Sequence, residues 1–452
     1  GGVFDHIGLG FHRYSTDQKW FLPHFEKMLY DQAMISMAYL EAYELTNNKE
    51  YADIAEEIFA YVLRDMTDKK GGFYSAEDAD SEGEEGKFYV WTNEEIVKIL
   101  GDKDGEKFID IFGFEDQGNF HDEATRQLTG SNIPYLKNKL SKYAKKNDLD
   151  IGKLKNTIEE NRLALFSHRK KRIHPLKDDK VLTDWNGLMI AALANGGKIL
   201  ENDKYINAAE NAADFILNNL KDDNGRLFKR YRKGSSGLQP HIDDYAFLIW
   251  GLLNLYEAGF KVHYLESAVE IAELMVSDFI DEENGGFFIG PESGEKLIVR
   301  AKDSYDGAIP SGNAVAAMNC IRLSKFTGDM KWDEIAQKTF LAFSDGINRV
   351  PSAHSFMLTS FMFGEESPKE IVVVSKEKDP EAISMVRKIQ GSYNPHSIMI
   401  LKNMNDTKTL DKVAPWTSMH DTIDDKITYY VCENFSCKMP TTDINTAIKY
   451  LQ

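Results

Sequence analysis

Two histidines stand at matching places in the sequence, and their side chains suit acid–base chemistry. A proline precedes both His24 and His241, and an apolar run follows at residues 28–30 and 245–250. Proline is tolerated in the first turn of a helix, so each pattern predicts a helix start. The pKa of imidazole lies near neutral pH, which lets histidine act as a general acid or base. We predict that His24 and His241 line one pocket as catalytic residues; the alternative is that each only caps its helix.

The same pattern, a proline at a predicted helix start, occurs twice more, at residues 310–313 and 351–354. The position three residues after each of the four prolines is polar. These four residues are Glu26, Asp243, Asn313 and His354. Recurrence at this scale indicates one helical unit used repeatedly. We expect a ring of such helices to direct the four side chains toward one central opening.

Carboxylates are dense at the same helix starts. Asp184 lies at one predicted helix start, and Asp243 and Asp244 lie at another. Glu26 and Asp31 are predicted in the first turns of a third helix. Glycoside hydrolysis needs two carboxyl groups, one acid and one base or nucleophile, and Asp184 with Asp243 or Asp244 would suit it. The alternative is that these carboxylates only cap helices and oppose the helix macrodipole.

The remaining candidate substrate-binding residues are neighbours of these groups in the sequence. Among them, a guanidinium can anchor a carboxylate or several hydroxyl groups. They are His12, Arg13, Tyr30, Asp78, Asp80, Trp185, Asn186 and Tyr245. The acidic stretch 77–85 has oxygen ligands for a hard cation but lacks the spacing of an EF-hand loop. We expect it to be a mobile loop over the pocket, and we predict no metal site and no cofactor.

Helical periodicity covers most of residues 1–365 and predicts hairpins of two helices. In each pair the first helix is rich in Ala, Leu and Met, and the second carries more charge. An apolar inner helix and an amphipathic outer helix are typical of an (α/α) toroid. The predicted pairs are 25–45 with 51–66, 186–200 with 205–220, 243–258 with 264–280, and 311–326 with 332–343.

The end of the chain has a different pattern. Apolar strands are predicted at 371–374 and 397–401 with a helix at 379–389 between them, which is a βαβ unit. A third strand is expected at 427–432 and a last helix at 442–451. We therefore predict a toroidal domain over residues 1–365 and a small α/β domain over residues 366–452.

The composition of the chain excludes some classes of binding partner. The net charge of −18 argues against nucleic acid or an anionic membrane. The longest apolar run, 246–256, is too short to span a bilayer. With three cysteines there is no disulfide framework, and we interpret Cys432 and Cys437 as two nearby structural thiols; the alternative is metal or redox use. We predict a cytoplasmic protein. The start at residues 1–5, without an initiator methionine, suggests that the sequence is truncated at its N-terminus.

Five segments together resemble a known family. They are residues 8–15, 20–31, 75–81, 182–187 and 430–432. They look like the bacterial YyaL-like family, whose animal relatives are spermatogenesis-associated, thioredoxin-domain-containing proteins. The resemblance implies an (α/α)6 toroid similar to six-hairpin glycosidases and N-acylglucosamine 2-epimerases. It also implies a thioredoxin-like domain in the full-length protein, ahead of the present first residue, and further barrel helices there.

The resemblance orders three functional hypotheses. In proteins similar to the epimerases, two histidines exchange a proton at the sugar carbon next to the carbonyl, and by position His24 and His241 would do so here. The second hypothesis is a glycoside hydrolase that uses Asp184 with Asp243 or Asp244. The third is a non-catalytic binding module that works with the thioredoxin-like domain. A small sugar is the expected ligand in the first two.

Overall fold

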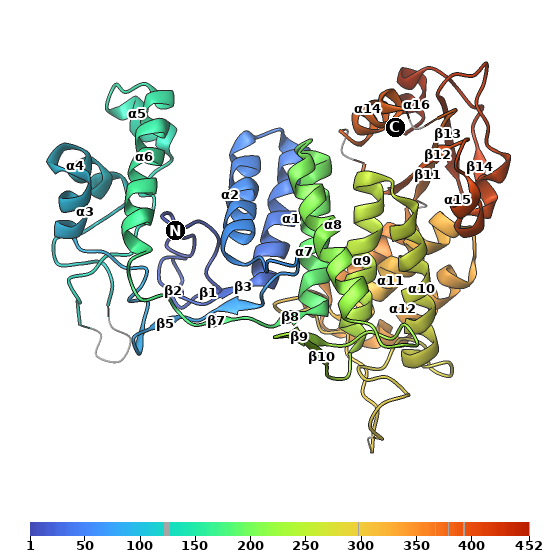
Figure 1. Cartoon of the computed structure of the whole chain (residues 1–452), viewed down its shortest axis with the longest axis horizontal. Helices are drawn as coiled ribbons and strands as arrows, with labels where there is room; N and C mark the ends of the chain where they lie inside the picture. The colour runs from blue at the N-terminus through green and yellow to red at the C-terminus, as the bar shows by residue number, and fades with distance from the viewer. Residues whose placement is uncertain (122–126, 297, 367, 378, 392–393, 452) are drawn as a thin grey trace. The chain divides into compact units, whose positions relative to one another are not determined.

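A computed structural model describes residues 1–452 except 122–126, 297, 367, 378, 392–393 and 452 (Figure 1). The chain forms two compact units. The first comprises residues 1–32, 57–66 and 74–179, and the second comprises 33–56, 67–73 and 180–452. The mainly α fold class, with helical hairpins and a small α/β region at the end of the chain, is confirmed. The domain boundary at 365/366 and closure into a six-hairpin ring stay predictions.

Paired helices build most of the second unit. The first helix of each pair is buried along most of its length, and the second is amphipathic, as the sequence predicted. A Cβ on Gly187 would lie 2.4 Å from the backbone carbon of Phe247, so glycine is needed where the first helices of two pairs touch. The pairs are α7 (Thr183–Ile199) with α8 (Asp203–Asn219), α9 (Ile242–Gly259) with α10 (Val262–Phe279), and α11 (Gly312–Thr327) with α12 (Lys331–Arg349), followed by η1 (Pro351–Ala353) and α13 (Ser355–Glu365).

Two further helices, α1 (Leu29–Thr46) and α2 (Lys49–Asp65), contribute residues to both units. A short sheet in the second unit joins the hairpins near the start of α7. It has the strand order β10-β9-β8, with β8 (Val181–Leu182), β9 (Arg230–Arg232) and β10 (Ser235–Gly237). Because β8 leads directly into α7, this sheet fixes where α7 begins.

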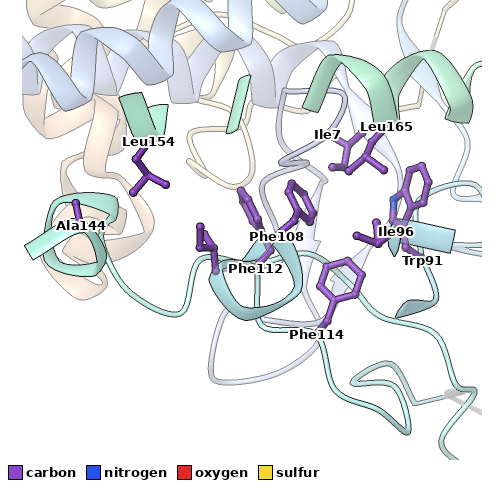
Figure 2. Close-up of a cluster of buried hydrophobic side chains, with 10 residues drawn as sticks. Ile7, Trp91, Ile96, Phe108, Phe112, Phe114, Ala144, Leu154 and Leu165 are labelled. Carbon is purple, nitrogen blue, oxygen red and sulfur yellow. The ribbon is translucent and has the colours of Figure 1, made fainter. Parts of the chain in front are cut away.

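Short strands and four helices make up the rest of the first unit. Its apolar core gathers Trp91, Phe108, Phe112 and Leu165 (Figure 2). The strands are β1 (Tyr14–Ser15), β2 (Pro23–His24), β3 (Lys27–Met28), β4 (Ala76–Glu77), β5 (Asp80–Ser81), β6 (Glu84–Glu85) and β7 (Lys177–Asp178). The helices are α3 (Asn93–Leu100), α4 (Asp102–Ile111), α5 (Leu140–Lys146) and α6 (Ile151–Arg169).

The predicted βαβ unit near the end of the chain is confirmed. Strand β11 (Lys369–Ser375) pairs in parallel with β12 (Ser397–Asn403), and α14 (Pro380–Gln390) connects them. Strand β13 (Thr428–Glu433) pairs antiparallel with β11 on its other side. The remaining elements are α15 (Lys408–Val413), η2 (Pro415–Met419), β14 (Ser436–Cys437) and α16 (Ile444–Leu451).

One predicted helix start is wrong. Pro23 and His24 form strand β2 and pair with β1, and α1 begins only at Leu29. The intervening β3 pairs with β4, so the sheet uses the backbone groups that a longer helix would have used. Glu26 therefore precedes the helix, whereas Asp31 lies in its first turn. The helix starts at His241, Ser311 and His354 are confirmed, since these residues are the N-caps of α9, α11 and α13.

Among the described residues, every helix is too short or too polar to cross a lipid bilayer.

Candidate functional site

The sheet at the start of α7 brings a lysine to two carboxylates in the second unit. Leu182 pairs with Arg230 across β8 and β9, and the N–H of Thr183 donates to the carbonyl of Lys229 at 3.1 Å. Lys229 therefore lies opposite the first turn of α7. Its Nζ donates to Oδ2 of Asp184 and lies 3.3 Å from Oδ1 of Asp244. We call Asp184, Lys229 and Asp244 the carboxylate–lysine cluster.

All oxygen atoms of the two carboxylates in this cluster have protein partners. Asp184 accepts from the N–H of Trp185 with Oδ1 (2.9 Å) and from Lys229 with Oδ2. Asp244 accepts from the N–H of Asp184 with Oδ1 (3.1 Å) and from the N–H of His241 with Oδ2 (2.7 Å). The Asp244 side chain is fully buried. The cluster thus ties the start of α7 to the start of α9.

The charged groups of the cluster shift one another's pKa values. Burial, and then the charge of Asp184, raise the pKa of Asp244 well above its usual value. Burial alone would lower the pKa of Lys229, but the carboxylates of Asp244 and Asp184 hold it above its usual value. Lys229 is therefore a permanent cation, and it is the group that lets two carboxylates share one buried place.

Next to the cluster, Asp243 and His241 have pKa values displaced in opposite directions. Burial first, and then Asp184 and Asp303, raise the pKa of Asp243 to about 6, against the lowering effects of Lys229 and the Gly312 N–H. A Cβ on Gly312 would lie 2.3 Å from Oδ1 of Asp243, so glycine lets the start of α11 approach that carboxyl. Burial and then Lys229 lower the pKa of the His241 imidazole, although the residue as a whole is exposed.

Two predicted substrate-binding asparagines bind the backbone of the aromatic segments that end the hairpins. Asn186 accepts from the N–H of Phe73 (2.8 Å) and donates to its carbonyl (3.0 Å). Asn313 accepts from the N–H of Phe287 (2.7 Å) and donates to its carbonyl (2.9 Å). Both side chains are fully buried. The repeated asparagine therefore fixes each aromatic segment to the start of the next inner helix.

The other candidates in the second unit lie in different surroundings. Tyr245 is buried, and its hydroxyl accepts from the N–H of Leu227 at 3.1 Å. Nδ1 of His354 lies 2.6 Å from the carbonyl of Ser304, and this histidine is also buried. Trp185 is partly exposed beside Asp184. The predicted ring of four polar groups is thus reduced here to Asp243 at the cluster, with Asn313 and His354 held by backbone groups.

A second charged group forms in the first unit. His24 is held between two carboxylates: its Nδ1 lies 2.6 Å from Oε1 of Glu85 and its Nε2 lies 3.2 Å from Oε2 of Glu26. Arg13 donates to Oε2 of Glu26 at 2.9 Å and to the hydroxyl of Tyr30 at 3.1 Å. Of the predicted residues, His24, Arg13, Glu26 and Tyr30 are in contact through these bonds, and short strands rather than a helix start position His24 and Glu26. Their role in binding a substrate stays a prediction.

The remaining predicted residues of the first unit differ in environment. Burial raises the pKa of Asp31 to about 7, opposed by Arg13, and its Oδ2 has no hydrogen-bond partner among the described residues. Burial and Lys27 lower the pKa of His12 to about 3; its Nδ1 lies 2.9 Å from the carbonyl of Phe25. Asp78 accepts from the N–H of Asp80 at 3.2 Å, and Asp80 is exposed in strand β5.

Two cavities of the described structure have no residue of the carboxylate–lysine cluster in their lining. One, of about 830 Å³, lies in the first unit against the acidic hairpin 81–85 and includes Lys171 and Arg172. The other, of about 550 Å³, lies in the second unit and includes Trp250, Glu257 and Arg322. Neither is lined by His241 or Asp243. The candidate site therefore rests on the chemistry of its side chains and not on the shape of a cavity.

Sequence reasoning missed Lys229 and Glu85. Glu85 belonged to a stretch interpreted only as a mobile loop, yet residues 84–85 pair with 80–81 in a hairpin. Lys229 directly follows the Gly-aromatic segment 225–228 and precedes a strand. Pairing of that strand with the residues before α7 was the signal that would have placed a cation beside Asp184.

No family model matches the chain. It is 36% identical to human spermatogenesis-associated protein 20 over 98% of this chain and 60% of that protein. An uncharacterised protein of Caenorhabditis elegans is 33% identical over 98% of this chain and 63% of its own length. The chain thus spans about three fifths of the curated relatives that it matches.

Similar solved structures are remote. A GH76 α-mannanase from Bacteroides thetaiotaomicron is 12% identical, with a TM-score of 0.43, over 81% of this chain and 73% of that one. A cellobiose 2-epimerase from Spirochaeta thermophila is 10% identical, with a TM-score of 0.42, over 76% of this chain and 80% of that one.

Proposed function

This chain is homologous to spermatogenesis-associated protein 20 over almost its whole length, and from that premise we propose that it is a sugar isomerase or epimerase whose acid–base residues in the second unit are His241 and Asp243. The choice of a sugar rests on the resemblance described for the sequence. The choice of residues rests on one observation: His241 and Asp243 lie two residues apart at the start of α9 with pKa values shifted toward each other, in a place where the neighbouring carboxylates are already bonded.

Each residue of the pair is then in the protonation state that the reaction needs. The lowered pKa of His241 favours the neutral imidazole, which can take a proton. The pKa of Asp243 is about 6, so near pH 6 about half of it is a neutral acid that can give one. Lys229 adds a fixed positive charge that stabilises negative charge on a nearby substrate oxygen. The carboxylate–lysine cluster holds the two helix starts that carry these groups.

The proposed step conserves atoms and charge. His241 takes the proton from the carbon next to the sugar carbonyl, while Asp243 gives its proton to the carbonyl oxygen. The product is an enediol, with imidazolium on His241 and carboxylate on Asp243. Return of the proton from His241 to the neighbouring carbon, while Asp243 takes the proton of the hydroxyl on the first carbon, completes isomerisation. Return of a proton to the opposite face of the first carbon, while Asp243 takes back the proton that it gave to the carbonyl oxygen, completes epimerisation.

Hydrolysis by paired carboxylates remains the second candidate, because Asp243 with its raised pKa suits a general acid. The bonding of Asp184 favours the isomerase. A hydrolytic base or nucleophile needs a free oxygen facing water or the sugar, and both oxygens of Asp184 are bonded to Trp185 and Lys229. The part played by His24, a thioredoxin-like domain as partner and a cytoplasmic location stay predictions.

Replacing His241 by asparagine is expected to lower proton exchange on a substrate sugar by about a thousandfold, the usual contribution of a general base. The measurement is proton NMR in heavy water with a panel of aldoses, ketoses and N-acetyl sugars, following deuterium entry at the carbon next to the carbonyl. His263→Asn is the matched control, since His263 is also exposed and lies near the start of the neighbouring helix α10.

Two results would reject this proposal. One is exchange that survives in His241→Asn at the wild-type rate. The other is a folded chain that exchanges no sugar of the panel but releases reducing ends from glycosides, which would favour hydrolysis. A pair of variants separates the two chemistries. Asp243→Asn, with exposed Asp223→Asn as its control, should leave the fold intact and strongly lower either reaction, whereas His241→Asn should strongly lower only the exchange.

A further inference from the structure

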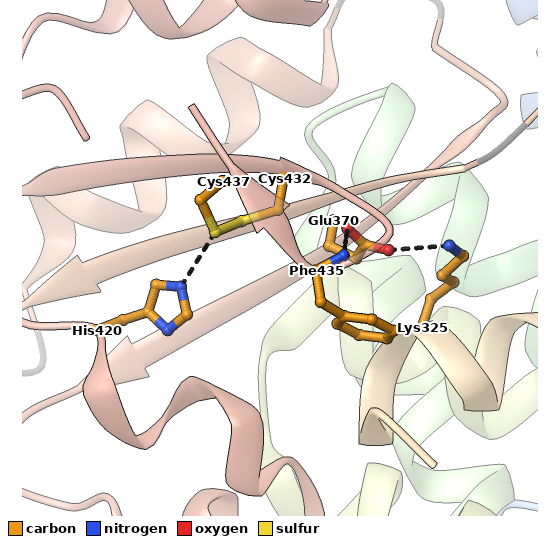
Figure 3. Close-up of a disulfide and its surroundings, with 6 residues drawn as sticks. All are labelled: Lys325, Glu370, His420, Cys432, Phe435 and Cys437. Atoms are coloured by element: carbon orange, nitrogen blue, oxygen red, sulfur yellow. Dashed lines mark hydrogen bonds and ion pairs between the residues drawn. A yellow bond between two sulfur atoms is a disulfide. The ribbon is translucent and has the colours of Figure 1, made fainter. Parts of the chain in front are cut away.

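The last antiparallel hairpin of the chain contains a disulfide. Cys432 in β13 and Cys437 in β14 lie directly opposite each other and are bonded (Figure 3). The interpretation of these cysteines as two structural thiols is therefore wrong. Asn434 and Phe435 form the two-residue turn of the hairpin. Both have positive φ (51° and 61°), as a type I′ turn requires. The turn itself brings the two sulfur atoms together.

Contacts other than the disulfide also hold this hairpin in place. The N–H of Phe435 donates to Oε2 of Glu370 at 3.2 Å, and Lys325 donates to Oδ1 of Asn434 at 2.8 Å. Lys325 and Glu370 lie 3.0 Å apart and link the turn to helix α11 and strand β11. Because these bonds do not involve sulfur, the hairpin has a way to stay in place when the disulfide opens.

The two cysteine residues differ in exposure. Cys432 is 1% exposed, whereas Cys437 belongs to the exposed residues of β14. A thiolate opens a disulfide by attacking one sulfur while the other leaves. An incoming thiolate therefore meets Cys437 first, and Cys432 is the leaving sulfur.

A histidine faces the exposed sulfur. Nε2 of His420 lies 3.5 Å from Sγ of Cys437 (Figure 3), and the residue is only 8% exposed. The ring packs edge-to-face against Trp416 and Tyr430. Lys402 holds the backbone of this segment by donating to the carbonyls of Thr417 (2.7 Å) and His420 (3.1 Å).

The His420 imidazole can carry a proton toward Cys437. Burial lowers the pKa of the ring, which favours its neutral form with one N–H. When that proton is on Nε2, the N–H lies beside Sγ of Cys437 and stabilises a thiolate there.

We propose that the Cys432–Cys437 disulfide is a redox site that exchanges with a dithiol, with Cys437 as the reactive sulfur and His420 as the residue that positions a proton beside it. This inference is independent of the proposed sugar chemistry. One thiolate of the dithiol attacks Cys437 and forms a mixed disulfide; the bond to Cys432 breaks, and Cys432 leaves as a thiolate that takes a proton from water. The second thiolate of the dithiol then closes its own disulfide and releases the Cys437 thiolate beside His420. Two electrons pass from the dithiol to the protein.

The test begins with the folded chain treated with dithiothreitol and, separately, with oxidised glutathione. Dithiothreitol should expose two thiols that accept a mass tag while the circular dichroism stays native. Cys320 is an internal control, because burial raises the pKa of its thiol and it should not react. With oxidised glutathione, the Cys437 thiolate of Cys432→Ser should attack the glutathione disulfide, form a mixed disulfide and release one glutathione thiolate. Cys437→Ser should form no mixed disulfide on the buried Cys432.

His420 is tested on the reduced chain by the rate of alkylation of Cys437 with iodoacetamide at pH 7. His420→Phe should slow this rate about tenfold, as expected when a neighbouring donor no longer favours the thiolate. His420→Gln, which keeps an N–H donor, should restore part of it. A disulfide that opens only in denaturant, or two cysteines that trap glutathione equally, would overturn the proposal in favour of a purely structural bond.

Discussion

Replacing Asp5 by alanine is expected to destabilise the first unit by about 3–5 kcal/mol, the usual cost of removing one partner from a buried ion pair. Asp5 accepts from Arg169 through both oxygens (2.9 and 2.7 Å) and from Lys27 at 2.7 Å. All three side chains are less than 5% exposed. Without Asp5, the buried cations Lys27 and Arg169 would lose the carboxylate that both of them pair with.

The pH dependence of this stability loss shows whether the charge of Asp5 causes it. Burial alone would raise the pKa of Asp5, but Arg169 and Lys27 hold it well below its usual value. A carboxyl with a lowered pKa contributes stability above its unfolded pKa of about 3.9, and this contribution is lost as the pH falls through the lower folded value. The difference between wild type and Asp5→Ala should therefore be full at pH 7 and shrink below about pH 4.

The measurement is urea unfolding combined with amide hydrogen exchange in residues of the first unit. Glu106→Ala, an exposed acid on α4, is the control and should change stability by less than about 0.5 kcal/mol. Equal effects of Asp5→Ala and Glu106→Ala would show that the triad contributes no net stability.

Replacing Lys229 by methionine should have the second large effect, about 3–5 kcal/mol, because Asp184 and Asp244 would then share a buried place without a cation. The pKa of Asp244 is already raised, so in the variant it should bind a proton more firmly still. A group whose folded pKa is raised gives stability that is lost as the pH rises through that value. The variant should therefore lose more stability at pH 8 than at pH 5.

Hydrogen exchange of the first turns of α7 and α9 is the measurement, since the cluster joins these two helices. Lys204→Met, which alters an exposed lysine on α8, is the control. A loss of stability that is the same at pH 5 and pH 8 would mean that the methylene chain of Lys229, and not its charge, is what the helices need.

Local patterns in the sequence predicted the hairpins, because helical periodicity and capping are short-range properties. The starts of α9 and α11 and the βαβ unit followed from them. His24 failed as a helix start because the residues after it pair with β4, about fifty positions along the chain. Propensity does not report such a distant partner, and tertiary pairing overrides it.

The same limit applies to the candidate site. The sequence showed Asp243 and Asp184 as acids at helix starts. It did not show the difference between them, which is that Asp184 forms an ion pair with Lys229. Strand pairing brings this lysine from 45 residues away. Asn186 and Asn313 are of a residue type that can bind a ligand. In the structure, however, their side-chain amides bond the backbone of Phe73 and Phe287. Only the structure shows which polar side chains are already bonded to the protein.

The most direct test of the account is the pH dependence of deuterium entry at the carbon next to the carbonyl, measured on a substrate sugar with wild type and Asp243→Asn. Exchange needs neutral His241, whose pKa is lowered, and protonated Asp243, whose pKa is about 6. We therefore expect a bell-shaped profile whose alkaline limb follows the deprotonation of Asp243 near pH 6. That limb should be absent from the residual activity of Asp243→Asn. Exchange that keeps rising above pH 7, or an alkaline limb unchanged in Asp243→Asn, would contradict the assignment of these two residues.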